Sequence, residues 1–364
     1  MVLSQDLCYP IVDLLLIVEK YDAYYIAFQY FNFVMSIVIC LVGLVGNAIV
    51  IFFIGFVMKN HKSKYWFLNL AIADAFCILT LPLHATATLE GSWTMGPHVC
   101  KLFLFSLCTN MYASVFILIA LNIARVLSVA KPMFHLKFMS RRVSFWICSF
   151  IWIFTILSCI PVFYFGGEVK IGDFVICSYM NTETFDIRYN ISSGNATGDI
   201  LYSEIYTKFN PLFQQCSSDT CCGGQMALDL WSHMLFTAEK FVIPFIIMGY
   251  FLPLGIVIVC NVTIAIQVRE SKTINTHRIY RIVLIIIAVF FITWTPVVIS
   301  ETVLFTAIVN RDLVAMLNVF LYMPLFVNIA YTNCCLNPIL YVLSGGQMRM
   351  GLSDFISSIR SSNT

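Results

Sequence analysis

Residues 100–125 read CKLFLFSLCTNMYASVFILIALNIAR, a mostly apolar run with a cysteine at one end and an arginine at the other. The ends are 25 residues apart (125 − 100 = 25). In an α-helix this separation is about 37 Å, slightly more than the roughly 30 Å hydrocarbon thickness of a bilayer. We therefore expect one helix to cross a membrane, with Cys100 at one face and Arg125 at the other.

The composition supports a membrane protein. Of the 364 residues, 60% are hydrophobic and 11% are charged, and the mean hydropathy is +0.87. This leaves too little polar surface to cover a water-soluble globule. Seven apolar segments are long enough to cross a bilayer as helices, at residues 27–57, 65–88, 97–129, 141–165, 240–268, 276–308 and 315–342. The predicted fold is an all-α, multi-pass bundle of seven transmembrane helices within residues 27–342.

Two terminal segments flank this domain. Residues 1–26 include an apolar stretch at 11–18 that is too short to cross a membrane and is flanked by acidic residues, so we interpret the segment as an exposed N-terminus rather than a signal peptide. In residues 343–364, the apolar positions 348, 352, 355, 356 and 359 share one helical face. This pattern predicts a short amphipathic eighth helix lying against membrane lipids, followed by a short tail.

Basic residues cluster beside alternate ends of the spans. They follow the first, third and fifth spans, at Lys59, Lys62, Lys64, Lys131, Lys137, Arg269 and Lys272. The positive-inside rule makes these loops cytoplasmic and the N-terminus extracellular. The opposite side is acidic, with net charges of −3 over residues 1–30 (one base, four acids) and −5 over residues 166–240 (four bases, nine acids). An acidic face favours cationic ligands, although acids also collect outside when bases are retained inside. The net charge of +2 gives no reason to expect nucleic acid.

The segment at residues 166–240 is the longest connection between spans and is predicted to be extracellular. Asn190 and Asn195 begin glycosylation motifs there. Cys100 and Cys177 both lie at the outer edge, where a bridge between them would pin this loop over the third helix. The other outer thiols, Cys8, Cys216, Cys221 and Cys222, allow three pairings. A zinc site among them is disfavoured, because no histidine stands at ligand spacing and the location is oxidising.

Asp74 is an acidic residue in the middle of the second span. A buried carboxylate without partners is costly in a membrane, so it is a functional candidate. Side chains at similar depth that could pair with it are Asn47, Ser114, Asn333 and Asn337. Such a cluster could hold a small cation or water, or could be a fixed interhelical network. Prolines at 82, 161, 253, 296 and 338 weaken single turns and predict kinks in five of the spans.

Several short motifs occur along the spans in a recognisable order. They are Gly46-Asn47, Leu70-Ala71-x-x-Asp74, Trp93 before Cys100, Arg125, Trp152, Pro253, Phe290-x-x-x-Trp294-x-Pro296 and Asn337-Pro338-Ile-Leu-Tyr341. Over nearly its whole length the chain resembles the rhodopsin-like G-protein-coupled receptors. Asn110-Met-Tyr-Ala-Ser-Val-Phe116 and Ile160-Pro-Val-Phe163 resemble the chemoattractant group, which contains anaphylatoxin, formyl-peptide and chemerin receptors.

This resemblance implies a plasma-membrane receptor with an outer ligand cavity and an inner site for a heterotrimeric G protein, of the inhibitory class. It implies a disulfide between Cys100 and Cys177, and a G-protein contact at Arg125. It implies an activation switch at Phe290, Trp294, Pro253, Asn337, Pro338 and Tyr341. No cofactor is obligatory, but a sodium ion is implied at Asp74, Ser114, Asn333 and Asn337. Serines in the tail are candidate phosphorylation sites for recruiting arrestin.

Alignment with the superfamily places ten residues around the outer cavity, namely His84, Leu107, Cys108, Met111, Tyr112, Val297, Glu301, Met323, Val327 and Tyr331. Leu107 stands where amine receptors have aspartate, and Tyr331 where opsins have the retinal lysine. Phe245 stands where anaphylatoxin receptors have an arginine for the ligand's carboxylate. The remaining expectation is an extracellular peptide ligand or the receptor's own long loop, near the anion Glu301. The alternative is a glycosylated loop with little contact to the cavity.

Departures from the family pattern predict ligand-independent activity. The family's Asp-Arg-Tyr is Ala124-Arg125-Val126 here, and Thr276 stands where an acid often begins the sixth helix, so the resting-state partners of Arg125 are missing. Asn261 replaces a tyrosine that stabilises the active state, which favours a non-signalling decoy instead. A ligand-dependent peptide receptor is the other alternative.

Two further classes are disfavoured by the sequence. A transporter or channel would need a polar path or repeated broken helices, and we find no internal repeat and one clearly deep acid. An enzyme would need a nucleophile with a base, or a metal set at matched depth, and neither is apparent. We therefore predict that the chain is not an enzyme.

Overall fold

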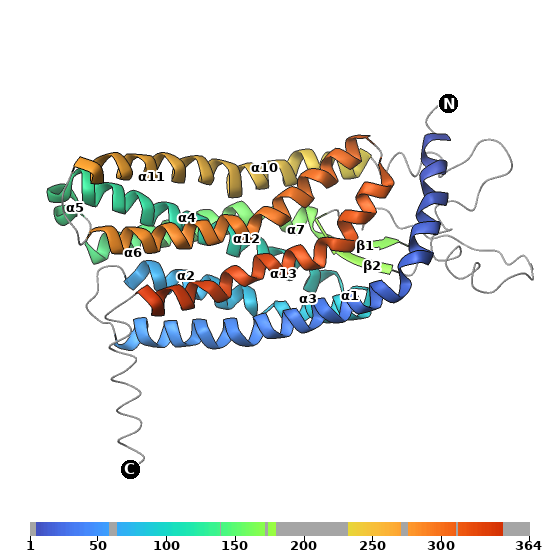
Figure 1. The fold of residues 1–364 in the computed structure, drawn as a ribbon, viewed down its shortest axis with the longest axis horizontal. Coiled ribbons are helices and arrows are strands. Elements are labelled where there is room, and N and C mark those ends of the chain that lie inside the picture. Colours follow the sequence, from blue (N-terminus) through green and yellow to red (C-terminus); the bar gives the residue numbers. More distant parts are fainter. Residues whose placement is uncertain are drawn as a thin grey trace, which may run out of the picture.

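The computed structural model describes residues 5–57, 64–138, 140–171, 174–179, 232–270, 276–310 and 312–344. In this part of the chain, seven helical segments are long and apolar enough to cross a membrane: Tyr25–Gly55, Tyr65–Glu90, Pro97–Ala130, Arg141–Phe165, Ser232–Gln267, Leu284–Asn310 and Asn318–Pro338. Figure 1 shows them side by side in an elongated bundle. The predicted seven-helix membrane fold is confirmed.

The first span belongs to α1 (Gln5–Phe52), which ends in a π-helical turn, η1 (Phe53–Val57). The second is divided into α2 (Lys64–Ile78) and α3 (Leu81–Glu90), and the third is α4 (Pro97–Ala130). The short α5 (Pro132–Phe138) leads to the fourth span, α6 (Arg141–Cys159) and α7 (Val162–Phe165). The first turns of α1, within the segment predicted to be exposed, are helical and bend away from the bundle in Figure 1.

The fifth span begins at Ser232, so the last residues of the predicted 166–240 loop are helical. It continues through the π-helical turn η3 (Ala238–Val242), α10 (Ile243–Ile246), the π-helical turn η4 (Ile247–Phe251) and α11 (Leu252–Glu270). The sixth span is in α12 (Thr276–Asn310) and the seventh in α13 (Leu313–Ser344). The eighth helix predicted after residue 343 lies outside the described residues.

The break between α2 and α3 has a clear cause in the sequence. Pro82 has no backbone N–H to donate one turn back, so the helix cannot continue unchanged through this turn. Thr80 occupies the break and its hydroxyl donates to the carbonyl of Cys77 at 2.8 Å. The same hydroxyl is hydrogen-bonded to Ser106 of α4 at 3.0 Å and to Tyr331 of α13 at 3.2 Å. The break therefore joins three spans.

The first and seventh spans are held together by buried polar groups. Ser36 Oγ donates to Asn328 Oδ1 at 2.7 Å, and Asn328 Nδ2 donates to Asn32 Oδ1 at 3.2 Å. All three side chains are fully buried. Next to Asn47 in the sequence, Gly46 packs so closely on Pro338 that an added Cβ would lie 3.1 Å from the proline ring. These contacts fix α1 along α13.

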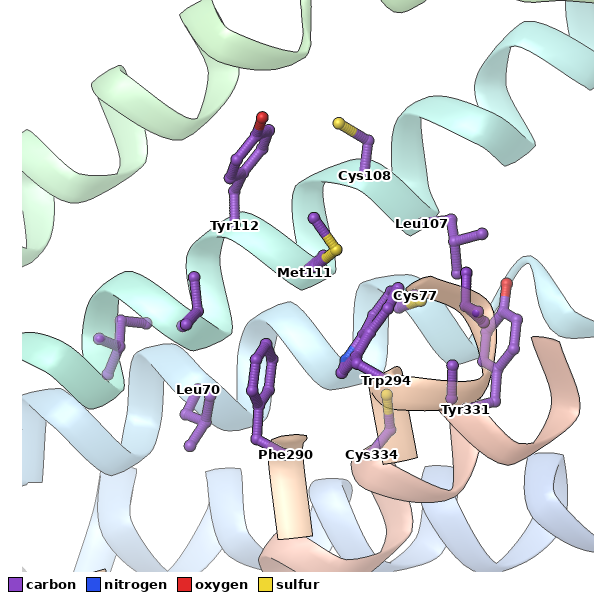
Figure 2. Close-up of a cluster of buried hydrophobic side chains, with 14 of the residues drawn as sticks. Leu70, Cys77, Leu107, Cys108, Met111, Tyr112, Phe290, Trp294, Tyr331 and Cys334 are labelled. Atoms are coloured by element: carbon purple, nitrogen blue, oxygen red, sulfur yellow. The ribbon is translucent and has the colours of Figure 1, made fainter. Parts of the chain in front are cut away.

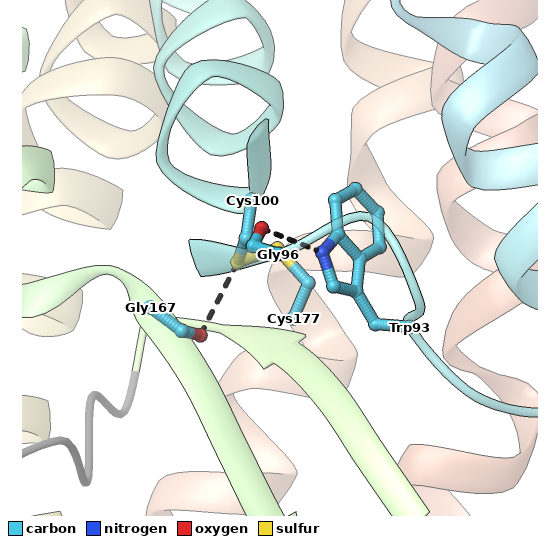
Figure 3. Close-up of a disulfide and its surroundings, with 5 residues drawn as sticks. All are labelled: Trp93, Gly96, Cys100, Gly167 and Cys177. Atoms are coloured by element: carbon cyan, nitrogen blue, oxygen red, sulfur yellow. Dashed lines mark hydrogen bonds between the residues drawn. A yellow bond between two sulfur atoms is a disulfide. The ribbon is translucent and has the colours of Figure 1, made fainter. Parts of the chain in front are cut away.

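One end of the bundle, here named the disulfide end, is closed by a hairpin of β1 (Gly167–Ile171) and β2 (Phe174–Ser178). The strands are antiparallel, with Glu168 opposite Cys177. Cys177 is bonded to Cys100 at the start of α4, with a Cα–Cα distance of 5.5 Å. Trp93 supports the joint: its backbone N–H donates to Val175 and its indole N–H to Gly96 (Figure 3). The hairpin is therefore anchored above α4.

Candidate functional site

Asp74 lies on α2 at the centre of the bundle and is fully buried. Asn110 Nδ2 of α4 donates to its Oδ1 at 3.0 Å. Asn337 Nδ2 of α13 donates to its Oδ2 at 2.8 Å. The carboxylate thus links three spans, which offsets part of the cost of burying it. Asn337 is one of the partners predicted from the sequence, whereas Asn110 was expected only as part of a family motif.

The other predicted partners of Asp74 lie elsewhere in this network. Asn47 Nδ2 donates to the carbonyl of Cys334 at 2.9 Å, which joins α1 to α13. The hydroxyl of Ser114 and both amide atoms of Asn333 are buried with no hydrogen-bond partner in the described structure. The amide oxygens of Asn47 and Asn337 also lack partners there.

The unsatisfied oxygens near Asp74 show whether the residues present suit the predicted sodium ion. Asn333 precedes Asn337 by one helical turn and Ser114 follows Asn110 by one turn, so each shares a helix face with a direct partner of Asp74. Buried oxygens around a carboxylate are the ligands that hard cations and ordered waters use. The chemistry of this donor set fits a small cation.

Figure 2 shows a cluster of buried side chains contributed by α2, α4, α12 and α13. Met111 of α4 points towards Trp294 of α12, and Tyr331 and Cys334 of α13 lie beside the indole. Trp294 is 1% exposed and its indole N–H has no hydrogen-bond partner among the described residues. Its ring centroid lies 6.1 Å from that of Phe290. The predicted switch residues Phe290 and Trp294 therefore lie next to the predicted ligand-cavity residues Met111 and Tyr331.

The remaining cavity residues lie on the inner faces of the surrounding helices. Leu107, Cys108, Tyr112, Val297 and Val327 are buried in one apolar cluster, and Met323 packs against it. His84 is stacked on Phe103 with a centroid distance of 5.8 Å, and its Nε2 lies 3.4 Å from the carbonyl of Pro324. Glu301, on α12, is partly buried.

Tyr179 brings the described end of the long loop into this cluster. Its ring lies 5.1 Å from Phe241 and 5.9 Å from Phe245 in the fifth span. Tyr112 meets Phe245 edge-on at 5.3 Å. Burial raises the pKa of the Tyr179 phenol well above its ordinary value, and the neighbouring Cys108 and Glu301 add to this effect. A residue two positions after the disulfide is thus part of the predicted cavity.

Arg125 lies near the opposite end of α4 and is partly buried. Its guanidinium makes no hydrogen bond or ion pair within the described part of the chain, and the preceding residue, Ala124, is 8% exposed and has no polar side chain. Among the other predicted switch residues, Pro253 and Pro338 are buried in their helices. The side chain of Tyr341 lies outside the described residues.

Several predicted features also fall outside the described residues. These are the glycosylation sites Asn190 and Asn195, the thiols of Cys8, Cys216, Cys221 and Cys222, the side chain of Thr276 and the serine-containing tail.

Comparison with known proteins identifies the family. The sequence profile described as "7 transmembrane receptor (rhodopsin family)" matches residues 46–198 and 200–341. The chain is 30% identical to chemerin-like receptor 1 of Sus scrofa over 317 residues, which cover 86% of this chain and 77% of that protein. It is 25% identical to C5a anaphylatoxin chemotactic receptor 1 of Rattus norvegicus over 338 residues, covering 91% and 82%.

These proteins are receptors and not enzymes, as predicted for this chain. The protein belongs to the rhodopsin family of seven-transmembrane receptors and is similar to its chemoattractant receptors.

Proposed function

We propose that the protein is a plasma-membrane receptor that activates a heterotrimeric G protein of the inhibitory class, with substantial activity in the absence of ligand. The N-terminus and the disulfide end face the exterior, and the end that carries Arg125 faces the cytoplasm. The observation that carries the proposal is the partly buried guanidinium of Arg125, for which the described residues provide no anionic or hydrogen-bonding partner.

The lack of a partner for Arg125 changes the relative free energies of the resting and active conformations. A cationic side chain near the low-dielectric interior is destabilising unless it is paired. In a resting receptor with an acid at position 124 that pairing would stabilise the resting state, but alanine cannot provide it. A conformation in which a G protein contacts Arg125 supplies the missing partners. The equilibrium therefore shifts towards that conformation even without ligand.

The outer cluster favours either a peptide with a cationic group or the receptor's own loop as the ligand. Glu301 is the anionic group near the cluster, and Tyr179 already packs against Phe241 and Phe245. This placement of Tyr179 supports a self-ligand, because Tyr179 belongs to the long loop and is packed against predicted cavity helices. A sodium ion held by Asp74 with Ser114, Asn333 and Asn337 would supply a positive charge that stabilises one arrangement of these helices.

The first experiment measures ligand-free G-protein activation in cells for the wild-type chain and for Arg125→Ala at matched surface expression. We expect a clear wild-type signal that the substitution abolishes, since Arg125 is the proposed contact. No signal from the wild-type chain would contradict basal activity and would favour a ligand-dependent or decoy receptor.

A second experiment tests the self-ligand. We expect deletion of residues 183–225, or Tyr179→Ala, to lower the basal signal while Arg125 stays intact. Phe236→Ala is a matched control, because Phe236 is an exposed aromatic residue in the fifth span, five residues before Phe241. Basal signalling that survives both changes would show that the loop is not the activating ligand.

A further inference from the structure

Cys108 and Cys159 form a close pair of thiols between the third and fourth spans. Cys108 lies on α4 and Cys159 is the last residue of α6. Their sulfur atoms are 3.0 Å apart, and both side chains are fully buried. A disulfide bond has a sulfur–sulfur distance of about 2.05 Å, so the two sulfur atoms must approach each other by about 1 Å to bond.

The pair lies on the side of the bundle that already carries a disulfide. Cys108 follows Cys100 by eight residues on the same helix (108 − 100 = 8), which corresponds to about 12 Å along the axis. Under the orientation proposed above, this depth is in the half of the membrane that faces the secretory lumen during synthesis. Disulfides form and persist in that compartment.

We propose that Cys108 and Cys159 are a site of oxidative cross-linking that ties α4 to α6. The co-reactant is a disulfide donor of the secretory compartment. One cysteine thiolate attacks the donor disulfide and forms a mixed disulfide, and the second thiolate then displaces the donor's remaining sulfur. The new Cys108–Cys159 bond replaces the donor's S–S bond, and the donor leaves as a dithiol that carries the two hydrogens. This exchange takes place before α4 and α6 close over the sulfur atoms.

The cross-link acts next to the residues that receive the long loop. Tyr112 follows Cys108 by one turn of α4, and its hydroxyl lies 3.5 Å from the carbonyl of Phe245. Phe245 in turn contacts Tyr179. A bond from Cys108 to α6 restricts rotation and sliding of α4 one turn from Tyr112. We therefore expect oxidation to stabilise the arrangement in which Tyr179 is packed in the cluster.

The test is a direct measurement of the bond in the full-length receptor. The protein is purified from cells without reductant, its free thiols are alkylated with N-ethylmaleimide under denaturing conditions, and peptides are analysed by mass spectrometry without reduction. We expect a peptide pair joined through Cys108 and Cys159, lighter by two hydrogens than the sum of the free peptides. Alkylation of both cysteines in most molecules would overturn the proposal.

Three variants control the measurement. Cys108→Ala and Cys159→Ala should each abolish the joined peptide and leave the other cysteine alkylated. Cys148→Ala should leave the joined peptide unchanged, because Cys148 is a buried thiol on the same helix eleven residues away (159 − 148 = 11). If the joined peptide persisted in Cys159→Ala with a different partner, the assignment of the pair would be wrong. The measurement does not depend on signalling, so it is independent of the proposed G-protein activity.

Discussion

Asp74 and Arg125 are charged residues in neighbouring spans of one bundle, but their surroundings are opposite. Asp74 is fully buried and accepts hydrogen bonds from Asn110 and Asn337, which belong to two other helices. Arg125 is partly buried and has no partner for its guanidinium in the described part of the chain. The centre of the bundle is therefore fixed by interhelical hydrogen bonds to a charge, whereas the end that carries Arg125 has no such constraint on its charge.

This difference indicates where the molecule can change conformation. Moving α2, α4 or α13 at the level of Asp74 breaks at least one hydrogen bond to a buried carboxylate, which is costly in a low-dielectric interior. Moving helices around Arg125 breaks no described bond to the guanidinium and can only add partners. We infer that the arginine end rearranges more readily than the centre.

The largest effect is expected from removing the carboxylate. Asp74→Leu leaves the amides of Asn110 and Asn337 buried without their acceptor, at a cost of roughly 1–3 kcal/mol for each. We expect a clear fall in the Tm of the detergent-solubilised receptor. Asp74→Asn is the control, because its amide oxygen can still accept one of the two hydrogen bonds. Its Tm should lie between those of Asp74→Leu and the wild type. Equal Tm values for Asp74→Leu and the wild type would mean that these bonds do not hold the centre together.

A matched pair of substitutions separates the structural partners from the candidate ion ligands. Asn110 and Asn333 are each 1% exposed, but Asn110 donates to Asp74 whereas the amide of Asn333 has no partner in the described structure. Asn110→Leu should lower the stability by about 1–3 kcal/mol, and Asn333→Leu should lower it less.

The effect of sodium on Tm tests Asn333 as an ion ligand. Under the proposed sodium site, added sodium chloride raises the Tm of the wild-type receptor more than that of Asn333→Leu, with choline chloride as the ionic-strength control. The same rise in both proteins would exclude Asn333 as a ligand.

The spans were predictable because apolar runs of bilayer length have few other stable structures. The start of the fifth span was not, because Ser232, His233 and Glu239 interrupt the apolar pattern while the helix continues through them. The depth of a residue in the membrane, which the sequence predicts, was also insufficient to identify the partner of Asp74. Asn47, Asn110 and Ser114 lie at similar depth, and the rotation of each helix about its axis, which is set by packing, decides which one reaches the carboxylate.

The cysteines show the same limit. Alignment with the superfamily placed Cys108 in the ligand cavity, and a cysteine within a span, such as Cys159, is ordinarily a small apolar packing residue. Their contact depends on the crossing of α4 and α6, which no local pattern reports. By contrast, the missing acid before Arg125 was visible in the sequence alone, because adjacent residues need no tertiary information.

A smaller effect is expected from giving Arg125 the partner that it lacks. Ala124→Asp places a carboxylate next to the arginine, and for a partly exposed ion pair we expect about 1 kcal/mol of stabilisation of the resting state. This corresponds to a roughly fivefold lower basal signal. Ala124→Asn is the control, since it has nearly the same shape without the charge and should have less effect. An unchanged signal in Ala124→Asp at equal surface expression would show that the unpaired charge does not drive basal activity.

The smallest effect concerns a neutral link between the same helices that meet at Asp74. Tyr331→Phe removes the hydroxyl that lies 3.2 Å from Thr80 Oγ1 but leaves Thr80 bonded to Cys77 and Ser106. We expect a loss of about 0.5 kcal/mol, at the low end for a hydrogen bond because Thr80 keeps two other partners, measured as a small decrease in Tm. Thr80→Val removes all three bonds and should cost more. If Tyr331→Phe were as destabilising as Asp74→Leu, the hydroxyl network at the break in the second span, rather than the buried carboxylate, would be the main constraint on the centre of the bundle.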